Sequence, residues 1–69
     1  MKISARNIFK GKIKQIIPGA VNSEVILETS GGETIVSVIT KESVERLKLK
    51  VGNEAYAVIK ASNVLIAVD

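Results

Sequence analysis

The sequence contains no cysteine and no histidine among its 69 residues. Disulfides, thiolate zinc sites and histidine metal sites are therefore excluded as ways of stabilising so short a chain. The same absences remove the common strong nucleophile and the common general base, so the sequence predicts a protein that is not an enzyme. A domain of this size buries a small share of its surface, which leaves self-association as a source of stability.

Aromatic side chains are almost as scarce, because the chain has one Phe, one Tyr and no Trp. Small barrels that bind single-stranded nucleic acid stack bases on aromatic side chains, and Phe9, which the pattern favours as a core residue, and Tyr56 offer little such surface. Lys10, Lys12 and Lys14 alternate along one stretch, and this lysine stripe either faces solvent or follows a phosphate backbone. With a net charge of +3, single-stranded nucleic-acid binding remains an alternative function.

Long apolar runs are also missing, and no stretch has the length of a membrane span or the pattern of a secretory signal. We therefore expect a cytoplasmic protein without a membrane partner. The hydrophobic residues, 46% of the chain, are mostly aliphatic and fall in short runs between turn residues. This pattern favours strands.

The runs predict five strands and one helix within a single domain, residues 1–69. That element order, with the helix between the third and fourth strands, is typical of an all-β, OB-like Greek-key barrel. The predicted strands cover 8–17, about 22–29, 34–39, 54–61 and 64–68, and the helix covers 41 to about 48.

Alternation in the first predicted strand places Phe9, Gly11, Ile13 and Ile17 on one face. A glycine inside a strand indicates a bend or bulge, so we expect one at Gly11. In the fourth predicted strand a row of alanines shares one face, which favours close approach of another backbone or subunit.

The third predicted strand carries branched aliphatic side chains on both faces. Val36 and Val38 fall on one face and Ile35 and Ile39 on the other. Because an open antiparallel sheet normally keeps one polar face, we expect protein on both sides of this strand. A partner subunit is the simplest cover.

Hydroxyl, amide and positively charged groups gather in Ser4-Ala5-Arg6-Asn7 and again in Lys60-Ala61-Ser62-Asn63. Thr40 and Ser43 add hydroxyls at the start of the predicted helix. Such donors suit a ligand that only accepts hydrogen bonds, such as an oxyanion. Each also has an ordinary structural interpretation, a solvated strand entrance for the first cluster and helix capping for Thr40 and Ser43.

Taken together and in order, these motifs resemble the molbindins, small bacterial molybdate-binding proteins with a TOBE-type oxyanion-binding domain. The resemblance covers essentially the whole chain. It is carried by six short motifs: Ser4-Ala5-Arg6-Asn7, Gly19-Ala20-Val21-Asn22, Ile39-Thr40, Ser43-Val44, Val51-Gly52 and Ala57-Val58-Ile59-Lys60-Ala61-Ser62.

The resemblance implies a homohexamer, a trimer of dimers, that binds molybdate or tungstate between subunits for intracellular molybdenum storage or homeostasis, without catalysis, organic cofactor or direct cation ligands. It implies that two residues of one subunit, Ser4 and Arg6, meet four of a neighbour: Thr40, Ser43, Lys60 and Ser62. A second oxyanion site near the three-fold axis would use donors of Ala20, Val21 and Asn22. A purely structural or docking module, kept soluble by its basic residues, remains a third hypothesis.

Overall fold

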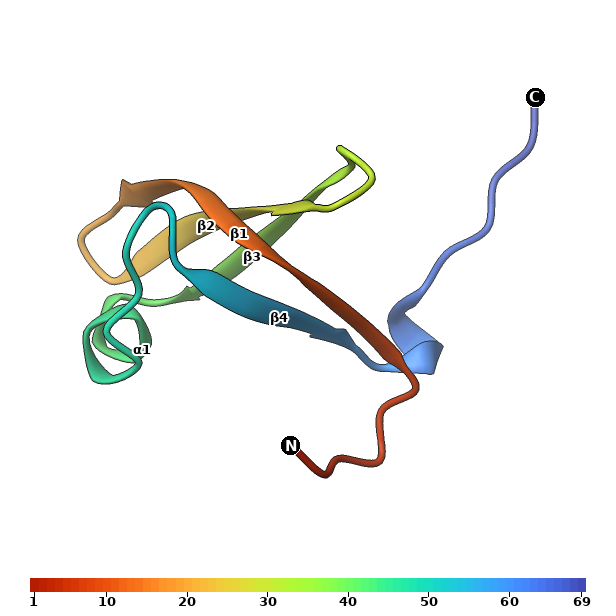
Figure 1. Cartoon of the computed structure of the whole chain (residues 1–69), viewed down its shortest axis with the longest axis horizontal. Helices are drawn as coiled ribbons and strands as arrows, with labels where there is room; N and C mark the ends of the chain where they lie inside the picture. Colours follow the sequence, from red (N-terminus) through yellow and green to blue (C-terminus); the bar gives the residue numbers. More distant parts are fainter.

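Strand β1, Asn7–Pro18, is the longest element and pairs along both of its edges. Its antiparallel partners are β2, Asn22–Thr29, and β4, Glu54–Ile59. Strand β3, Thr34–Thr40, pairs with β2, which gives the order β3-β2-β1-β4. The computed structural model, which describes residues 1–69, shows this sheet as an open, curved half-barrel with a helix at one end (Figure 1).

The only α-helix, α1, covers Lys41–Arg46 and lies between β3 and β4 as predicted. Thr40 is its N-cap and accepts a hydrogen bond from the backbone N–H of Ser43 at 3.0 Å. The helix ends at Arg46 rather than near Lys48, because Lys48 adopts a φ of 54°, which an α-helix cannot contain. No helix in the structure has the length and apolar character needed to cross a membrane.

The core lies on the concave side of the sheet, where Ile13, Val25 and Leu27 are buried. Ser23 is the only buried polar residue. Six partly buried side chains pack around this centre: Ile16, Ile39, Val44, Leu49, Ala55 and Ala57. With only 4 of 69 residues buried, one chain alone leaves most of its aliphatic side chains in contact with solvent.

A β-bulge in β1 changes which residues face the core. The register with β2 shifts between Ile13 and Gln15, which leaves Lys14 as an extra residue. Beyond the bulge Ile16 packs against the core, whereas Ile17 is 42% exposed. The prediction that Ile17 shares a face with Ile13 is therefore wrong, because one extra residue inverts the alternation.

Gly11 is not the site of the bulge. A Cβ at Gly11 would collide with the carbonyl oxygen of Glu28, in the neighbouring strand β2. The glycine is therefore required for close approach of two backbones rather than for a change in register.

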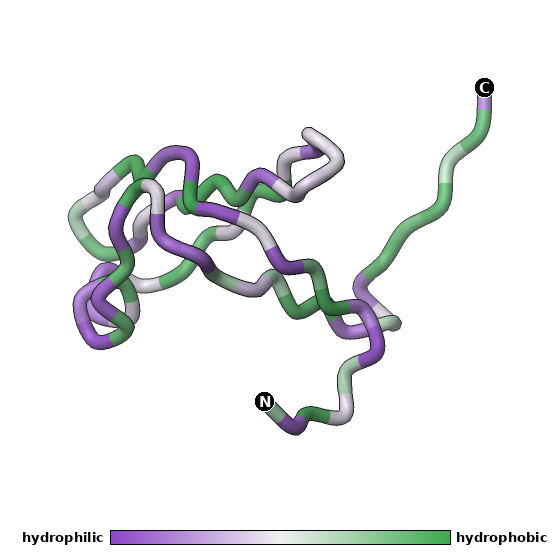
Figure 2. Tube along the Cα trace, in the orientation of Figure 1, coloured by the Kyte–Doolittle hydropathy of each residue, from purple (hydrophilic) through white to green (hydrophobic).

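The predicted fifth strand over 64–68 does not form in this chain. Strand β4 ends at Ile59, the 3-10 helix η1 covers Ala61–Asn63, and the chain then leaves the sheet (Figure 1). Figure 2 shows that this departing segment is largely hydrophobic. An isolated extended segment has no neighbour for its backbone groups, so it is not a strand. The sheet consequently has four strands and stays open.

Candidate functional site

One group of candidate donors lies where β1 begins and β4 ends. Asn7 pairs with Ile59 across the sheet, and its side-chain Nδ2 donates a hydrogen bond to the Ile59 carbonyl oxygen at 3.2 Å. Arg6 and Lys60 are the next residues outward, so they lie at the same end, where the N-terminal segment and η1 are neighbours (Figure 1). We call this the Arg6/Lys60 end, and its candidate residues are Ser4, Arg6, Lys60 and Ser62.

The other candidates lie at the opposite end of the sheet. Asn22 pairs with Thr40, and the backbone N–H of Lys41 donates to the Val21 carbonyl oxygen at 2.8 Å. The turn between β1 and β2 therefore lies against the start of α1. We call this the Thr40/Val21 end, and its candidate residues are Ala20, Val21, Asn22, Thr40 and Ser43.

The length of β1 keeps the two ends apart, since its 12 residues rise by about 3.3 Å each. One chain therefore does not bring the six predicted oxyanion-binding residues together. In a single copy, Lys60 and Ser62 accompany Arg6 rather than Thr40. This division depends on pairing between residues far apart in sequence.

The side-chain hydroxyls of Thr40 and Ser43 are hydrogen-bonded to each other. Thr40 Oγ1 accepts from the Ser43 backbone N–H and donates its own hydrogen to Ser43 Oγ at 2.8 Å. The capping interpretation is therefore confirmed for Thr40. Because Ser43 Oγ accepts this bond, its own hydrogen remains available for a ligand.

Positive charge at the Arg6/Lys60 end is not neutralised within the chain. The two salt bridges of the protein join Lys10 to Glu54 at 3.2 Å and Lys14 to Glu28 at 3.3 Å. No carboxylate forms a salt bridge with Arg6 or Lys60, which favours an anionic ligand there. No group of three carboxylates gathers anywhere in the structure to hold a metal cation.

The lysine stripe is largely paired with carboxylates. The hydrogen bond from Lys10 to Glu54 and the charge of Glu54 raise the pKa of Lys10 above its ordinary value. Lys14 contacts Glu28 across the bulge, which leaves Lys12 as the unpaired member. The stripe therefore provides a mixed-charge surface rather than a basic track for a phosphate backbone.

Comparison with known proteins identifies the family. The sequence profile of the TOBE domain matches residues 3–66. The chain belongs to the TOBE domain family. This TOBE domain is 46% identical over 69 residues to a probable molybdenum-pterin-binding protein of Haemophilus influenzae, with 100% of each chain covered.

Two solved structures extend the similarity. MopII from Clostridium pasteurianum has a TM-score of 0.93 and 46% identity, covering 97% of this TOBE domain and 100% of that chain. The cytoplasmic molybdate-binding protein ModG, in a form with molybdate bound, has a TM-score of 0.91 and 55% identity, covering 94% of this domain and 46% of that chain. Both structures support the overall fold and the family assignment.

The two aromatic side chains of this TOBE domain do not form one stacking surface. Phe9 pairs with Ala57 and Tyr56 pairs with Lys10, and adjacent pairs along two strands point to opposite faces. Phe9 is 43% exposed, so the prediction that it belongs to the core is wrong. These positions remove the aromatic platform on which the nucleic-acid alternative depends.

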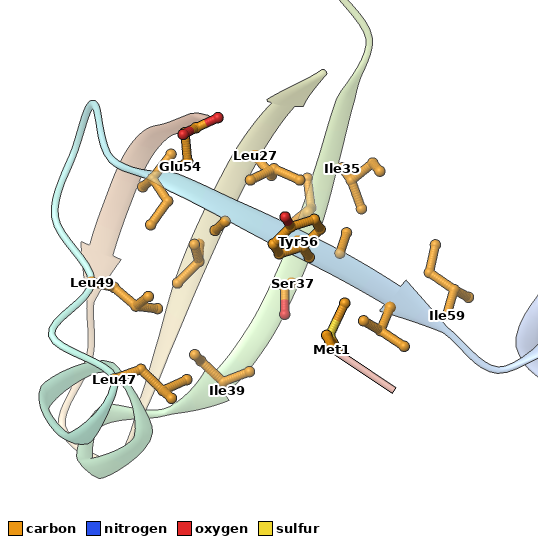
Figure 3. Close-up of a pocket in the computed structure, with 16 residues that line it drawn as sticks. Met1, Leu27, Ile35, Ser37, Ile39, Leu47, Leu49, Glu54, Tyr56 and Ile59 are labelled. Carbon is orange, nitrogen blue, oxygen red and sulfur yellow. The ribbon is translucent and has the colours of Figure 1, made fainter. Parts of the chain in front are cut away.

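An apolar groove of about 630 Å³ lies on the side of the sheet that carries the core residues Ile13, Val25 and Leu27. In Figure 3, side chains of β2, β3 and β4 point into it together with Leu47 and Leu49. None of the candidate oxyanion donors lines this groove. Sequence reasoning did not identify the groove, although the small side chains of Ala55 and Ala57 were a signal that something approaches this face.

Proposed function

We propose that this TOBE domain binds molybdate, and tungstate in the same way, at sites completed between copies of the chain. The observation that carries the proposal is the separation of the donors into two exposed half-sites at opposite ends of the sheet. The names of the relatives, which are molybdenum-pterin-binding and molybdate-binding proteins, support the choice of ligand.

The two ends of the sheet offer different groups that can bind the same tetrahedral dianion. The Arg6/Lys60 end supplies two fixed positive charges free of carboxylates, and the Thr40/Val21 end supplies the Ser43 hydroxyl. Molybdate accepts hydrogen bonds and donates none, so both sets of groups are suitable partners. Neither end encloses an anion alone, because Arg6 and Lys60 are exposed and Ser43 is only half-buried.

In the site we propose, the Arg6/Lys60 end of one copy meets the Thr40/Val21 end of another. Ser4, Arg6, Lys60 and Ser62 would come from the first copy and Thr40 and Ser43 from the second. A second site, near a three-fold axis, would take backbone and amide donors from the turn at Ala20, Val21 and Asn22. The exposed position of that turn supports this assignment.

The assembly we propose is a homohexamer, built as a trimer of dimers, that acts in the cytoplasm as a non-catalytic store or buffer of molybdenum without an organic cofactor. Exposed aliphatic side chains on several strands support self-association. Static light scattering tests the assembly directly, because a hexamer has six times the 7.4 kDa mass of the chain. A monomer at all concentrations would contradict it.

Equilibrium dialysis against molybdate, followed by metal analysis of the protein compartment, tests the function itself. We expect molybdenum to accumulate with the protein, tungstate to compete for the same sites and chloride to have no effect at equal ionic strength. A protein compartment with no excess molybdenum would contradict the proposal and favour a purely structural module.

A further inference from the structure

The net charge of the chain is concentrated in one short stretch. Residues 46–50, which we call the basic loop, read Arg-Leu-Lys-Leu-Lys and lead from the last residue of α1 towards β4 (Figure 1). The basic loop holds three of the ten basic residues and no acidic residue, and the remaining basic residues balance the seven acidic residues of the chain. The formal net charge of +3 therefore equals the charge of this loop.

The three charges of the basic loop have no partner within the chain. Arg46, Lys48 and Lys50 are all exposed. They take part in neither of the two salt bridges and in none of the side-chain hydrogen bonds. The next carboxylate along the chain, that of Glu54, is already paired with Lys10.

The backbone of the basic loop is fixed where it leaves α1. Lys48 N–H donates to the Glu45 carbonyl oxygen at 3.1 Å. Leu49 N–H donates to the Val44 carbonyl oxygen, also at 3.1 Å, and the two bonds together form a Schellman motif. The side chains of Val44 and Leu49 pack against the core, which anchors this end of the loop.

The other end of the basic loop is fixed by a turn. Asn53 N–H donates to the Lys50 carbonyl oxygen at 3.1 Å, and Gly52 N–H donates to the carbonyl oxygen of Ile13 in β1 at 2.8 Å. The charged side chains are therefore presented from a backbone that is held at both ends. A surface that is ordered in advance loses less entropy when a partner binds.

Lys48 adopts a backbone conformation that favours glycine. Its φ of 54° lies in the left-handed region, where the Cβ of an L-residue is crowded, and glycine is the usual residue at this position after a helix. The side chain of Lys48 forms no hydrogen bond or salt bridge that offsets this strain. A strained residue without an internal partner points to a role outside the chain.

Exposed aliphatic side chains lie among these charges. Leu47 is 60% exposed and Val51 is 61% exposed. Protein interfaces combine apolar residues with a polar and charged rim. Surfaces for single-stranded nucleic acid use aromatic side chains instead, and residues 46–51 include none. The composition of this surface therefore favours a protein partner.

The basic loop is close to one of the two half-sites. Leu47 N–H donates to the Ser43 carbonyl oxygen at 2.9 Å, so the loop begins one helical turn after Ser43. A protein bound to the basic loop would stand beside the Thr40/Val21 end.

We propose that the basic loop is the docking surface for an acidic protein that takes molybdate from this TOBE domain. Carboxylates of the partner pair with Arg46, Lys48 and Lys50, and an apolar side chain among those carboxylates covers Val51. Complementary charge of this kind speeds association and excludes partners of the wrong charge. The cargo in this proposal rests on the proposed function, whereas the docking surface itself does not.

The first test measures binding of a fluorescein-labelled peptide, in which glutamates surround a central leucine, by fluorescence anisotropy at low ionic strength. The loop variant replaces the three bases of the loop: Arg46→Gln, Lys48→Gln and Lys50→Gln. The control variant has the same net charge and replaces three exposed bases outside the loop and outside both salt bridges: Lys2→Gln, Lys12→Gln and Lys41→Gln.

We expect the loop variant to bind the peptide roughly tenfold more weakly than the control variant does. In the unaltered chain, amide NMR shifts caused by the peptide should centre on residues 46–51. Equal weakening in both variants would show that only net charge matters, and would overturn the proposal. Single-stranded DNA that binds the basic loop more tightly than the peptide would overturn the assignment to a protein partner.

The second test separates a docking role of Lys48 from a structural one. Lys48→Gly removes both the charge and the strain, so we expect a higher melting temperature and weaker peptide binding. Lys48→Arg keeps the charge and should keep the peptide affinity. A lower melting temperature in Lys48→Gly would show that the lysine stabilises the fold, and would overturn the argument from strain.

Equilibrium dialysis distinguishes these outcomes from those of the proposed function. We expect the loop variant to retain as much molybdenum as the unaltered chain. An unaltered chain that binds the peptide through the basic loop but retains no molybdenum would refute oxyanion binding and support the docking surface. A chain that retains molybdenum, and whose loop variant binds the peptide as well as the control variant does, would do the reverse.

Discussion

Asn7 and Ile59, 52 positions apart in sequence, are joined by a side-chain to backbone hydrogen bond of 3.2 Å. The bond fixes the start of β1 against the end of β4. Arg6 and Lys60 flank this pair directly, so their separation depends on it. Asn7 is therefore a positioning residue for the charged half-site.

Asn7→Ala should weaken molybdate binding and lower the stability of the apo protein by about 1 kcal/mol, the usual net value of one such hydrogen bond. Isothermal titration calorimetry and chemical denaturation measure the two effects. Asn53→Ala is the matched control, because the side chain of Asn53 makes no hydrogen bond in the structure. Equal effects of the two substitutions would exclude a positioning role.

Arg6→Ala should weaken molybdate binding by roughly 10- to 100-fold, because it removes a charge-assisted donor. The apo protein should keep its melting temperature, since Arg6 is exposed and makes no salt bridge. Arg46→Ala, at the last turn of α1, removes the other arginine of the chain and should leave affinity unchanged. Full affinity in Arg6→Ala would remove this residue from the site.

Mixing two defective chains tests whether a site is shared between copies. Arg6→Ala retains an intact Thr40/Val21 end, whereas Ser43→Ala retains an intact Arg6/Lys60 end. When the two are refolded together, random pairing should restore tight binding at about one quarter of the sites, because a head-to-tail contact uses one end from each copy. Calorimetry of the mixture should show this tight fraction, and its absence would indicate that each site lies within one chain.

Molybdate should raise the melting temperature of the protein. A ligand that binds only the folded state adds about 2.7 kcal/mol of stability when its free concentration is 100 times its dissociation constant. Differential scanning fluorimetry with increasing molybdate measures the shift, and sodium chloride of equal ionic strength is the control. An unchanged melting temperature at millimolar molybdate would contradict binding to the folded state.

Local features of the fold were predictable from the sequence. The cap at Thr40 depends on residues three positions apart, and the alternation in β4 follows directly from its alanines. The faces of β1 were not predictable beyond Lys14, because nothing in Lys12-Ile13-Lys14-Gln15 marks the extra residue. A single unmarked bulge was enough to reverse the position of Ile17.

Features that depend on distant partners could not be predicted. The residue types of the candidate site were recognisable, but their division into two ends follows from the Asn7–Ile59 and Asn22–Thr40 pairings. Residues 64–68 have the composition of a strand, and composition does not say which sheet edge a strand will join. In the structure these residues join no edge of the sheet.

The opposite placement of the two half-sites affects the closure of an assembly. A row of copies joined head to tail leaves one unused half-site at each extremity, so it holds one complete site fewer than it has copies. A closed ring has no free end, so every half-site has a partner and the ring holds as many complete sites as copies. An anion that binds only complete sites would therefore favour rings over open rows. The concentration of the ligand would then influence the shape of the assembly as well as the occupancy of its sites.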